Sequence, residues 1–268
     1  MRPSTERPRL TPLPAAAFLV LTSFFSAHAQ FGGPPPGPRG PAKTIAPFDL
    51  TGYWVSLITE DWRFRMITPP KGDFEGVPLN GAGRMLANAW DPAKDEAAGE
   101  QCKSYGAAAL MRVPGRFHIT WQDDNTLKIE ADAGTQTRLL HFGAASASPG
   151  PASLQGYSAA EWVFALGGRA GRGGQGQPGA AAQRGGSLKV TTTNLKAGYL
   201  RKNGVPYSAN ATVTEFYDLL HESDGSTWVV VKTIVTDPTY LTGPFITSTN
   251  LRKQADNKGW SPSACDAR

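Results

Sequence analysis

Alternating hydrophobic and polar residues recur along the chain at a spacing of about ten residues, which is the pattern of short strands joined by turns. Phe117, Ile119 and Trp121 alternate with polar residues, and comparable runs follow at 127–131 and 135–142. Successive side chains of a strand point to opposite faces, so each run gathers its hydrophobic residues on one face. The pattern therefore predicts an antiparallel β-meander in this part of the chain.

Further hydrophobic runs predict strands on both sides of this meander. They cover residues 49–66, 160–166, 187–195, 211–220, 227–236 and 245–253. Asn80 and Asp91 precede two short helical stretches and are expected to cap them, the second stretch running from Pro92 to Lys103. About nine or ten strands with one or two short helices predict an all-β fold. Many antiparallel strands with edges to protect favour a closed barrel.

The first 29 residues have the order of a secretory signal peptide. Early arginines precede an apolar run, and Ala-His-Ala at 27–29 forms a cleavage box before Gln30. We therefore expect an exported protein, periplasmic or extracellular, whose mature chain starts at Gln30. Residues 30–47 are rich in proline and glycine and predict an extended tether. A single β-barrel domain is expected over residues 48–268.

A glycine-rich segment of low complexity covers residues 167–186. Its arginines and glycines resemble the RGG segments that bind RNA. In an exported protein we favour a simpler interpretation, a disordered tip between two strands, because the segment lacks the apolar residues that would offset its ordering entropy.

Charge and cysteine content narrow the expected partners. The chain carries 27 basic and 22 acidic residues, and part of this excess belongs to the leader and the insert, so no nucleic-acid partner is expected. No second apolar run is long enough to span a membrane. Cys102 and Cys265 form an even pair, which predicts one disulfide in an exported protein, with two free thiols as the alternative. No cofactor and no metal are expected.

Several short motifs form one ordered series. They are TRLLH at 137–141, GYS at 156–158 followed by Trp162, NGVPYS at 203–208, TEF at 214–216 and DPTYLTGPF at 237–245. The series resembles that of a large group of uncharacterised secreted bacterial proteins with a cysteine near each end. The resemblance covers roughly residues 48–265 and implies fold and compartment, but no chemistry.

The chain departs from that pattern in three places. Ala159 and Ala160 replace the glycine step after Ser158, the glycine-rich insert replaces a short turn after Trp162, and Tyr207 stands where the group has a histidine. The missing histidine argues against a metal role at that position.

A second resemblance, to lipocalin-like barrels, rests on Gly52-Tyr53-Trp54 at the start of the first strand. Arg252 in the last strand is expected to supply the arginine that packs over Trp54, and the alternative is an ordinary buried strand tryptophan. The predicted fold class is accordingly an all-β, antiparallel lipocalin-like β-barrel.

Histidines offer the first candidate chemistry. His118 and His141 lie on predicted strands that could converge, and a metal would need a third ligand such as Asp123 or Glu161. We favour the simpler interpretation of two strand histidines bonded to neighbouring groups. A triad of Ser158, His141 and Asp124 fits by residue type only. The second glycine of a nucleophile elbow is missing, and a meander lacks the strand–turn–helix that the elbow needs.

Glu215 lies on the same face of its predicted strand as Val213 and Tyr217. Burial of a carboxylate on such an apolar face costs free energy unless the carboxylate is paired. We expect Lys232 of the next strand as its cross-strand partner. The functional alternative is an acid or base with a raised pKa inside a pocket.

Aromatic residues suggest a ligand site. Trp54, Trp62, Trp121 and Trp162 would line a ligand-filled barrel, and the alternative is ordinary core. The leading function is therefore an exported β-barrel module that binds a small apolar or amphipathic ligand. One alternative is an envelope enzyme of hydrolase, lyase or isomerase type. Its acid and base candidates are Glu215, His118, His141 and Tyr207. Another alternative is a structural or interaction protein.

Overall fold

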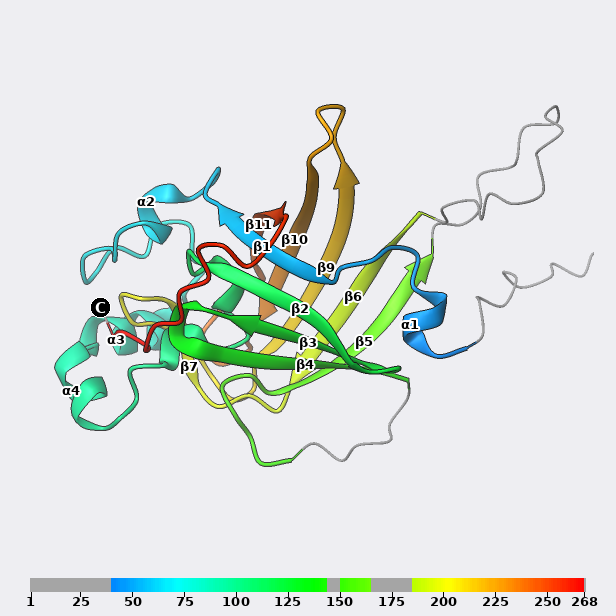
Figure 1. Ribbon diagram of the computed structural model, residues 1–268. Helices are drawn as coiled ribbons and strands as arrows, with labels where there is room; N and C mark the ends of the chain where they lie inside the picture. Colours follow the sequence, from blue (N-terminus) through cyan, green and yellow to red (C-terminus); the bar gives the residue numbers. More distant parts are fainter. Residues whose placement is uncertain (1–39, 144–149, 165–184, 268) are drawn as a thin grey trace, which may run out of the picture. The chain divides into compact units, whose positions relative to one another are not determined.

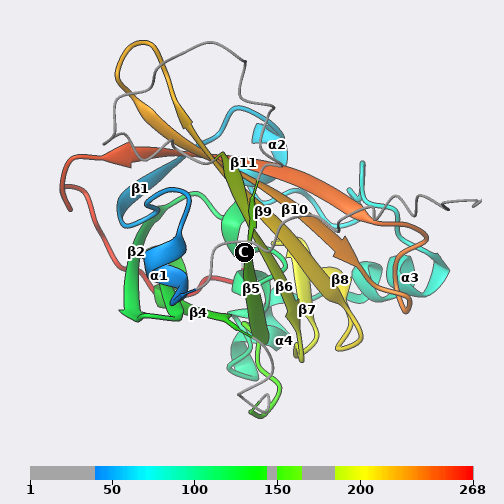
Figure 2. The same ribbon diagram turned by 90° about the vertical axis from the view of Figure 1, so that its right-hand side faces the viewer.

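The computed structural model describes residues 40–143, 150–164 and 185–267. Nine of its strands close into a barrel in the order β1-β11-β10-β9-β6-β5-β4-β3-β2, which confirms the all-β barrel (Figures 1 and 2). The barrel strands are β1 Gly52–Leu57, β2 Arg116–Asp123, β3 Thr126–Ala131, β4 Gln136–Phe142, β5 Tyr157–Phe164, β6 Gly186–Thr193, β9 Thr212–His221, β10 Thr227–Thr236 and β11 Phe245–Gln254.

The barrel is mixed rather than wholly antiparallel. Strands β4 and β5 run parallel, with Leu140 opposite Ser158, while the other barrel pairs are antiparallel. A parallel pair needs a crossover of about a dozen residues, and residues 143–156 supply one of that length. The spacing of hydrophobic runs along the sequence cannot show whether two strands pair in parallel or antiparallel, because both arrangements give the same spacing.

The first strand is shorter than predicted. Strand β1 ends at Leu57, and helix α2 (Trp62–Arg65) follows in place of the expected continuation to residue 66. Asp61 adopts a left-handed conformation with φ of 52°, which turns the chain before the helix. The alternation of Trp62 and Phe64 was therefore not that of a strand.

Two helices begin where the sequence predicts them, but the second ends at Ala97 and does not reach Lys103. In α3 (Gly81–Ala89) the Asn80 side chain accepts a hydrogen bond from the Gly83 N–H at 2.9 Å. In α4 (Pro92–Ala97) the Asp91 side chain accepts from the Ala93 N–H at 3.1 Å. Three 3₁₀ turns complete the helical elements: η1 Lys103–Tyr105, η2 Leu110–Arg112 and η3 Ala133–Thr135.

A small hairpin of β7 (Gly198–Arg201) and β8 (Val205–Tyr207) stands apart from the barrel sheet and was not predicted. Gly204 forms its turn with φ of 79°, and a side chain there would collide with Trp90. The hairpin packs with α3 and η1 over a second hydrophobic core, next to the end of the barrel.

The second half of the predicted tether belongs to the folded part. Helix α1 (Ala42–Ile45) is bound to the β2–β3 turn, because the Lys43 N–H donates to the Asp124 carbonyl at 3.0 Å and the Ala42 N–H to the Asn125 side chain at 2.9 Å. Figure 1 shows α1 at the opposite end of the barrel strands from α3 and α4. The predicted signal peptide, residues 30–39 and nearly all of the glycine-rich insert lie outside the described residues.

The barrel interior is filled by side chains. Buried hydrophobic residues from all nine strands form one cluster, and the largest members are Trp54, Phe117, Ile119, Leu127, Ile129, Leu140, Leu188 and Tyr217. Strand β10 shows the alternation of inward and outward side chains clearly. Val229, Val231 and Thr233 are buried, and Lys232, between the last two, is exposed. Of the helices in the described ranges, none is long and apolar enough to cross a membrane.

Candidate functional site

Glu215 faces the barrel interior, as its parity predicted, but its partner is Arg138 of β4. The Arg138 guanidinium donates to both carboxylate oxygens, with Nη1–Oε1 at 3.1 Å and Nη2–Oε2 at 2.7 Å. Both side chains are fully buried. Thr192 and Ser158 lie beside the guanidinium at 3.2 Å and 3.4 Å from Nη2, so a polar network continues from the pair.

The charges of this network support one another. Burial opposes the charge of Arg138, but the Glu215 carboxylate outweighs it and raises the pKa of Arg138 above its ordinary value. Burial and the same carboxylate raise the pKa of Tyr217, whose hydroxyl donates to Glu215 Oε1 at 3.4 Å. The carboxylate is therefore held by partners inside a packed core.

The predicted pairing of Glu215 with Lys232 is wrong. In the β9–β10 register Thr233 lies opposite Glu215, and Lys232 lies opposite Phe216 on the outer face. There its ammonium sits 4.5 Å from the centre of the Phe216 ring. Strand β10 carries hydrophobic residues on both faces, so its parity alone did not identify the inner one.

The two histidines stay apart on the outer face. His118 stacks on Tyr53 at 4.1 Å, and its Nδ1 lies 3.3 Å from Glu130. His141 stacks on Tyr157 at 5.1 Å.

The register explains why they do not meet. On β3, His118 lies opposite Glu130 and His141 opposite Thr126. Four residues along a strand are roughly 13 Å, so these two histidines cannot share a metal. Among the described residues, no group of three acidic, histidine or cysteine side chains is placed to hold a metal ion. Ser158 points inward and is buried, while His141 belongs to the outer face, so the considered triad is not assembled either.

The four tryptophans do not line one cavity. Trp54 is fully buried in the core, and its ring is covered by Lys253 at 5.4 Å, whereas Arg252 lies over Trp228. The predicted packing of Arg252 over Trp54 is therefore wrong. Trp121 and Trp162 pack on either side of Phe142, at 5.5 Å and 5.2 Å between ring centres. Trp62 is 63 % exposed on α2, outside the barrel.

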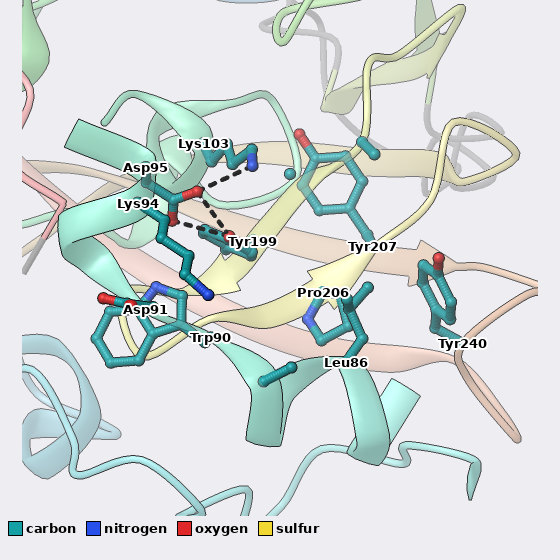
Figure 3. Close-up of a pocket in the computed structure, with 13 residues that line it drawn as sticks. Leu86, Trp90, Asp91, Lys94, Asp95, Lys103, Tyr199, Pro206, Tyr207 and Tyr240 are labelled. Atoms are coloured by element: carbon teal, nitrogen blue, oxygen red, sulfur yellow. Dashed lines mark hydrogen bonds and ion pairs between the residues drawn. The ribbon is translucent and has the colours of Figure 1, made fainter. Parts of the chain in front are cut away.

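A pocket of about 180 Å³ opens where α3, α4, η1 and the β7–β8 hairpin meet (Figure 3). We call it the end pocket. Apolar and aromatic side chains form much of its wall, contributed by Leu86, Ala89, Trp90, Ala197, Pro206 and Tyr240. Asp91, Lys94, Asp95, Lys103, Gly198, Tyr199 and Tyr207 complete the lining. The end pocket thus combines an apolar wall with a polar end.

The polar end is organised around Asp95. The Tyr199 hydroxyl donates to its carboxylate at 2.9 Å, and the Lys103 ammonium lies 3.0 Å from the same group (Figure 3). Burial, followed by the hydrogen bond to Asp95, raises the pKa of Tyr199 to about 12. Burial disfavours the charge of Lys103, yet its hydrogen bonds to Glu100 and Asp95 prevail and raise its pKa. Tyr199 therefore stays neutral and Lys103 stays charged at neutral pH.

Tyr207 lines the same pocket and carries a polar group without a partner. Its side chain is fully buried, and its hydroxyl makes no hydrogen bond to the described residues. Burial raises the pKa of this hydroxyl, so it is a neutral donor at physiological pH. Two glycines make room for it, because a Cβ on Gly106 or Gly198 would lie 2.3 or 2.6 Å from the hydroxyl oxygen.

Of the four predicted acid–base candidates, only Tyr207 lies at this pocket. Sequence reasoning missed Asp95, Lys103 and Tyr199. The sequence offered one local signal, the acidic residue Asp95 inside the helix that Asp91 caps. In the structure Asp95 is 7 % exposed. Such a carboxylate requires a partner.

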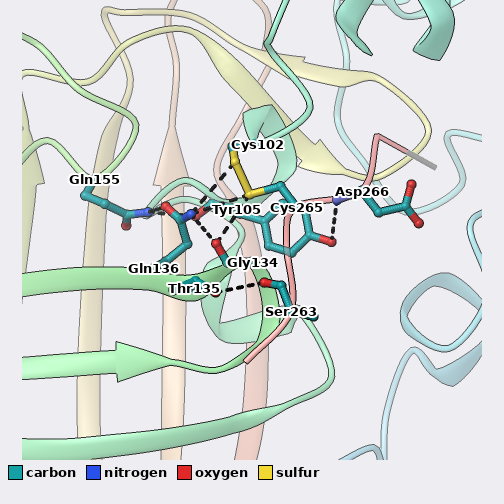
Figure 4. The surroundings of a disulfide bond; sticks show 9 residues. All are labelled: Cys102, Tyr105, Gly134, Thr135, Gln136, Gln155, Ser263, Cys265 and Asp266. Carbon is teal, nitrogen blue, oxygen red and sulfur yellow. Dashed lines mark hydrogen bonds between the residues drawn. A yellow bond between two sulfur atoms is a disulfide. The ribbon is translucent and has the colours of Figure 1, made fainter. Parts of the chain in front are cut away.

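The predicted disulfide is confirmed. Cys102 and Cys265 are joined, with 5.1 Å between their Cα atoms (Figure 4). The carboxyl-terminal segment beside it is held by further bonds, since the Thr135 hydroxyl donates to the Ser263 carbonyl at 2.9 Å and the Asp266 N–H to the Tyr105 hydroxyl at 3.3 Å. Cys102 directly precedes η1, so the bond anchors the segment that carries Lys103 into the end pocket.

No model of a known protein family matches the chain, and no curated protein matches it. The resemblance to secreted bacterial proteins therefore stays a prediction that rests on the motif series. The structure does explain why some of these motifs occur together. Arg138, Ser158 and Glu215 come from three of them and meet in one buried network. Ser208 and Asp237 come from two others, and their side chains bond at 2.7 Å.

Proposed function

We propose that this β-barrel module binds a small amphipathic molecule in the end pocket, and not inside the barrel. The observation that carries the proposal is the buried, unpartnered Tyr207 hydroxyl beside an apolar wall. A buried hydroxyl without a partner costs about 1–3 kcal/mol, which a ligand that accepts its hydrogen bond would recover. Export from the cell belongs to the same proposal and is supported by the Cys102–Cys265 disulfide.

The size of the pocket limits the ligand. Drug-sized ligands occupy roughly 300–1,000 Å³, while a cavity of about 150 Å³ binds benzene. At about 180 Å³ the end pocket accepts a body of one aromatic ring or a similar apolar group. Trp90 and Tyr240 offer ring faces or edges for such a body.

The polar end of the pocket determines which polar group the ligand carries. Asp95 is already satisfied by Tyr199 and Lys103, so these three groups form a fixed polar surface. Two donors have no partner among the described residues, the Tyr207 hydroxyl and the Trp90 Nε1–H, and both belong to side chains of the lining. We therefore propose a ligand with one apolar ring and a neutral or anionic oxygen that accepts from Tyr207.

The arrangement supports the enzyme alternative less. Acid–base catalysis needs two titratable groups that converge on one cavity. Glu215 is sealed inside the barrel, and His118 and His141 lie on its outer face, so these candidates do not converge. Asp95, Lys103 and Tyr199 do meet at the end pocket, but they are bonded to one another, so the carboxylate is held by two partners and is not free to exchange a proton with a ligand. The filled barrel instead favours the structural or interaction role as the second candidate, and the same experiment distinguishes it.

The test is a titration of small one-ring phenols and aryl carboxylates followed by two-dimensional amide NMR. Shifts should concentrate on α3, α4 and the β7–β8 hairpin. Ala89→Trp fills the end pocket from an exposed position and should abolish them. Ala82→Trp is the matched control, because Ala82 is also exposed on α3 but does not line the pocket.

Tyr207→Phe separates binding from structure. Removal of an unpartnered buried hydroxyl should leave the folding free energy unchanged or raise it, while the affinity for the best ligand should fall about fivefold. No saturable binding in the wild type, or equal binding by the Ala89→Trp variant, contradicts the proposal and favours a structural role.

A further inference from the structure

A second hollow, away from the end pocket, is lined by arginines from three different elements. Arg65 belongs to α2, Arg112 to η2 and Arg201 to β7. Their exposures are 6 %, 5 % and 4 %, so all three guanidinium groups are withdrawn from water. Lys202 also lines the hollow, and no acidic residue belongs to the lining of the hollow.

The acidic neighbours do not satisfy this charge. Glu60 lies 3.3 Å from Arg65, and Asp61 lies 3.1 Å from Arg112. Both carboxylates are partly exposed. Arg201 has instead a backbone partner, since its Nη1 donates to the Glu75 carbonyl at 2.7 Å. Asp61 and Asp73 also act on the charge of Arg201, but none of the ion pairs among the described residues includes this arginine.

Donor groups are left over as well. Arg65 Nη2, Arg112 Nη2 and Arg201 Nε are buried and make no hydrogen bond to the described residues. Each unmade bond at a buried charged donor costs more than the roughly 1–3 kcal/mol of a neutral group. All three donors belong to side chains that line one hollow, and a single bound group with several acceptor atoms would satisfy them.

The electrostatics agree with the geometry. Burial, and next the neighbouring charge of Arg112, lower the pKa of both Arg65 and Arg201 to about 10. Burial also lowers the pKa of Arg112. The guanidinium carbon of Arg201 also lies 3.9 Å from the centre of the Phe64 ring, and this cation–π contact helps to hold Arg201 in place.

We propose that Arg65, Arg112 and Arg201 form a binding site for an oxyanion, either a small free anion or the carboxylate or phosphoryl end of a larger molecule. The guanidinium group suits both chemistries, because its fixed N–H fork matches their oxygen atoms. The hollow measures about 30 Å³. Since one water molecule needs roughly 10–15 Å³, this is space for about two water-sized groups, which suits the oxygen atoms of a carboxylate or phosphoryl end but not an aromatic body.

The site differs from the end pocket in chemistry and in residues. Its lining shares no residue with the end pocket, and it selects negative charge, whereas the end pocket selects an apolar ring. The two proposals can therefore fail separately.

The experiment measures anion binding to the purified full chain by calorimetry and by thermal unfolding. Inorganic phosphate and acetate are titrated at constant ionic strength, with chloride as the reference. We expect saturable binding at one site and a rise of the melting temperature with at least one of the two anions. Phosphate alone would identify a phosphoryl group, acetate alone a carboxylate, and both a general oxyanion site.

Arg201→Met keeps the packing on Phe64 and removes the donor, so it should weaken binding at least about tenfold. Arg84→Met is the control, since Arg84 is an exposed arginine of α3 outside the hollow. Arg201→Lys, which keeps the charge but loses the fork, replaces the first variant if that one does not fold. No binding of either anion by the wild type, or equal losses in the Arg201 and Arg84 variants, overturns the proposal.

Discussion

At the scale of single residues, the Arg138–Glu215 pair shows how a charge is kept inside the barrel. Strands β4 and β9 are not neighbours, because β5 and β6 lie between them in the barrel order. The bidentate bond between their side chains therefore spans the interior. It fixes the relative position of two strands that share no backbone hydrogen bonds. The desolvation of two ions roughly cancels their attraction, so the pair contributes more to a unique packing than to stability.

This view predicts an asymmetric mutational response. Glu215→Gln leaves the Arg138 charge unpaired and should lower the unfolding free energy by about 3–5 kcal/mol in denaturant titrations. The double variant Arg138→Met with Glu215→Leu should recover most of that loss. Glu161→Gln breaks an exposed pair with Lys189 and should cost less than about 1 kcal/mol. A loss at Glu215 as small as that at Glu161 would show that the pair is not buried in solution.

Tyr199 gives a prediction on pH. Its folded pKa of about 12 lies above the ordinary 10.0, so the folded state holds the proton more tightly than the unfolded state does. The stability that this contributes is complete below pH 10 and is lost as the pH rises towards 12. The difference in unfolding free energy between the wild type and Tyr199→Phe should therefore shrink across this range. A constant difference between pH 10 and 12 would show that folding does not raise the pKa of Tyr199.

At the scale of elements, the disulfide is the strongest single constraint on the carboxyl-terminal segment. After β11 ends at Gln254, that segment is held at η3 and η1 by few bonds. Cys265→Ser opens a loop of 163 residues, whose closure is worth about 5 kcal/mol in the chain-entropy model and usually less in practice. We expect a lower melting temperature and faster amide exchange over residues 255–267. Cys102→Ser should give the same loss, and an unchanged melting temperature in both variants would contradict the account.

The elements that the sequence predicted correctly are those with one clear local cause. The meander at 116–142 alternates regularly, and Asn80 and Asp91 are caps with a helix directly behind them. The missed β7–β8 hairpin has Pro206 inside a strand, and a proline there argues against a strand in any local analysis. Helix α2 is only four residues long, and its alternating residues fit a strand equally well.

The candidate site was less accessible to prediction for a similar reason. The parity of Glu215 identified its inward face, but no local pattern shows that Arg138, 77 positions away, reaches it. The end pocket is assembled from segments around residues 86–103, 197–199, 206–207 and 240. Only the fold brings these together, and Tyr207 was the one residue of this lining that the sequence had singled out as a candidate.

At the scale of the whole described domain, the barrel is a filled scaffold and the proposed chemistry lies beside it. Helix α1 is fixed against one turn of the barrel, and α3, α4 and the small hairpin form the end pocket elsewhere. Ligand recognition by loops and helices on a rigid scaffold is a common division of labour. The central claim is therefore that the end pocket binds a small molecule.

Native mass spectrometry of protein purified from the periplasm of an expressing bacterium tests that claim most directly. The account predicts that wild-type protein and Ala82→Trp carry the same additional small mass. It predicts that Ala89→Trp, with its end pocket filled, carries none. A wild type without any bound mass, or an Ala89→Trp variant that retains it, would contradict the account.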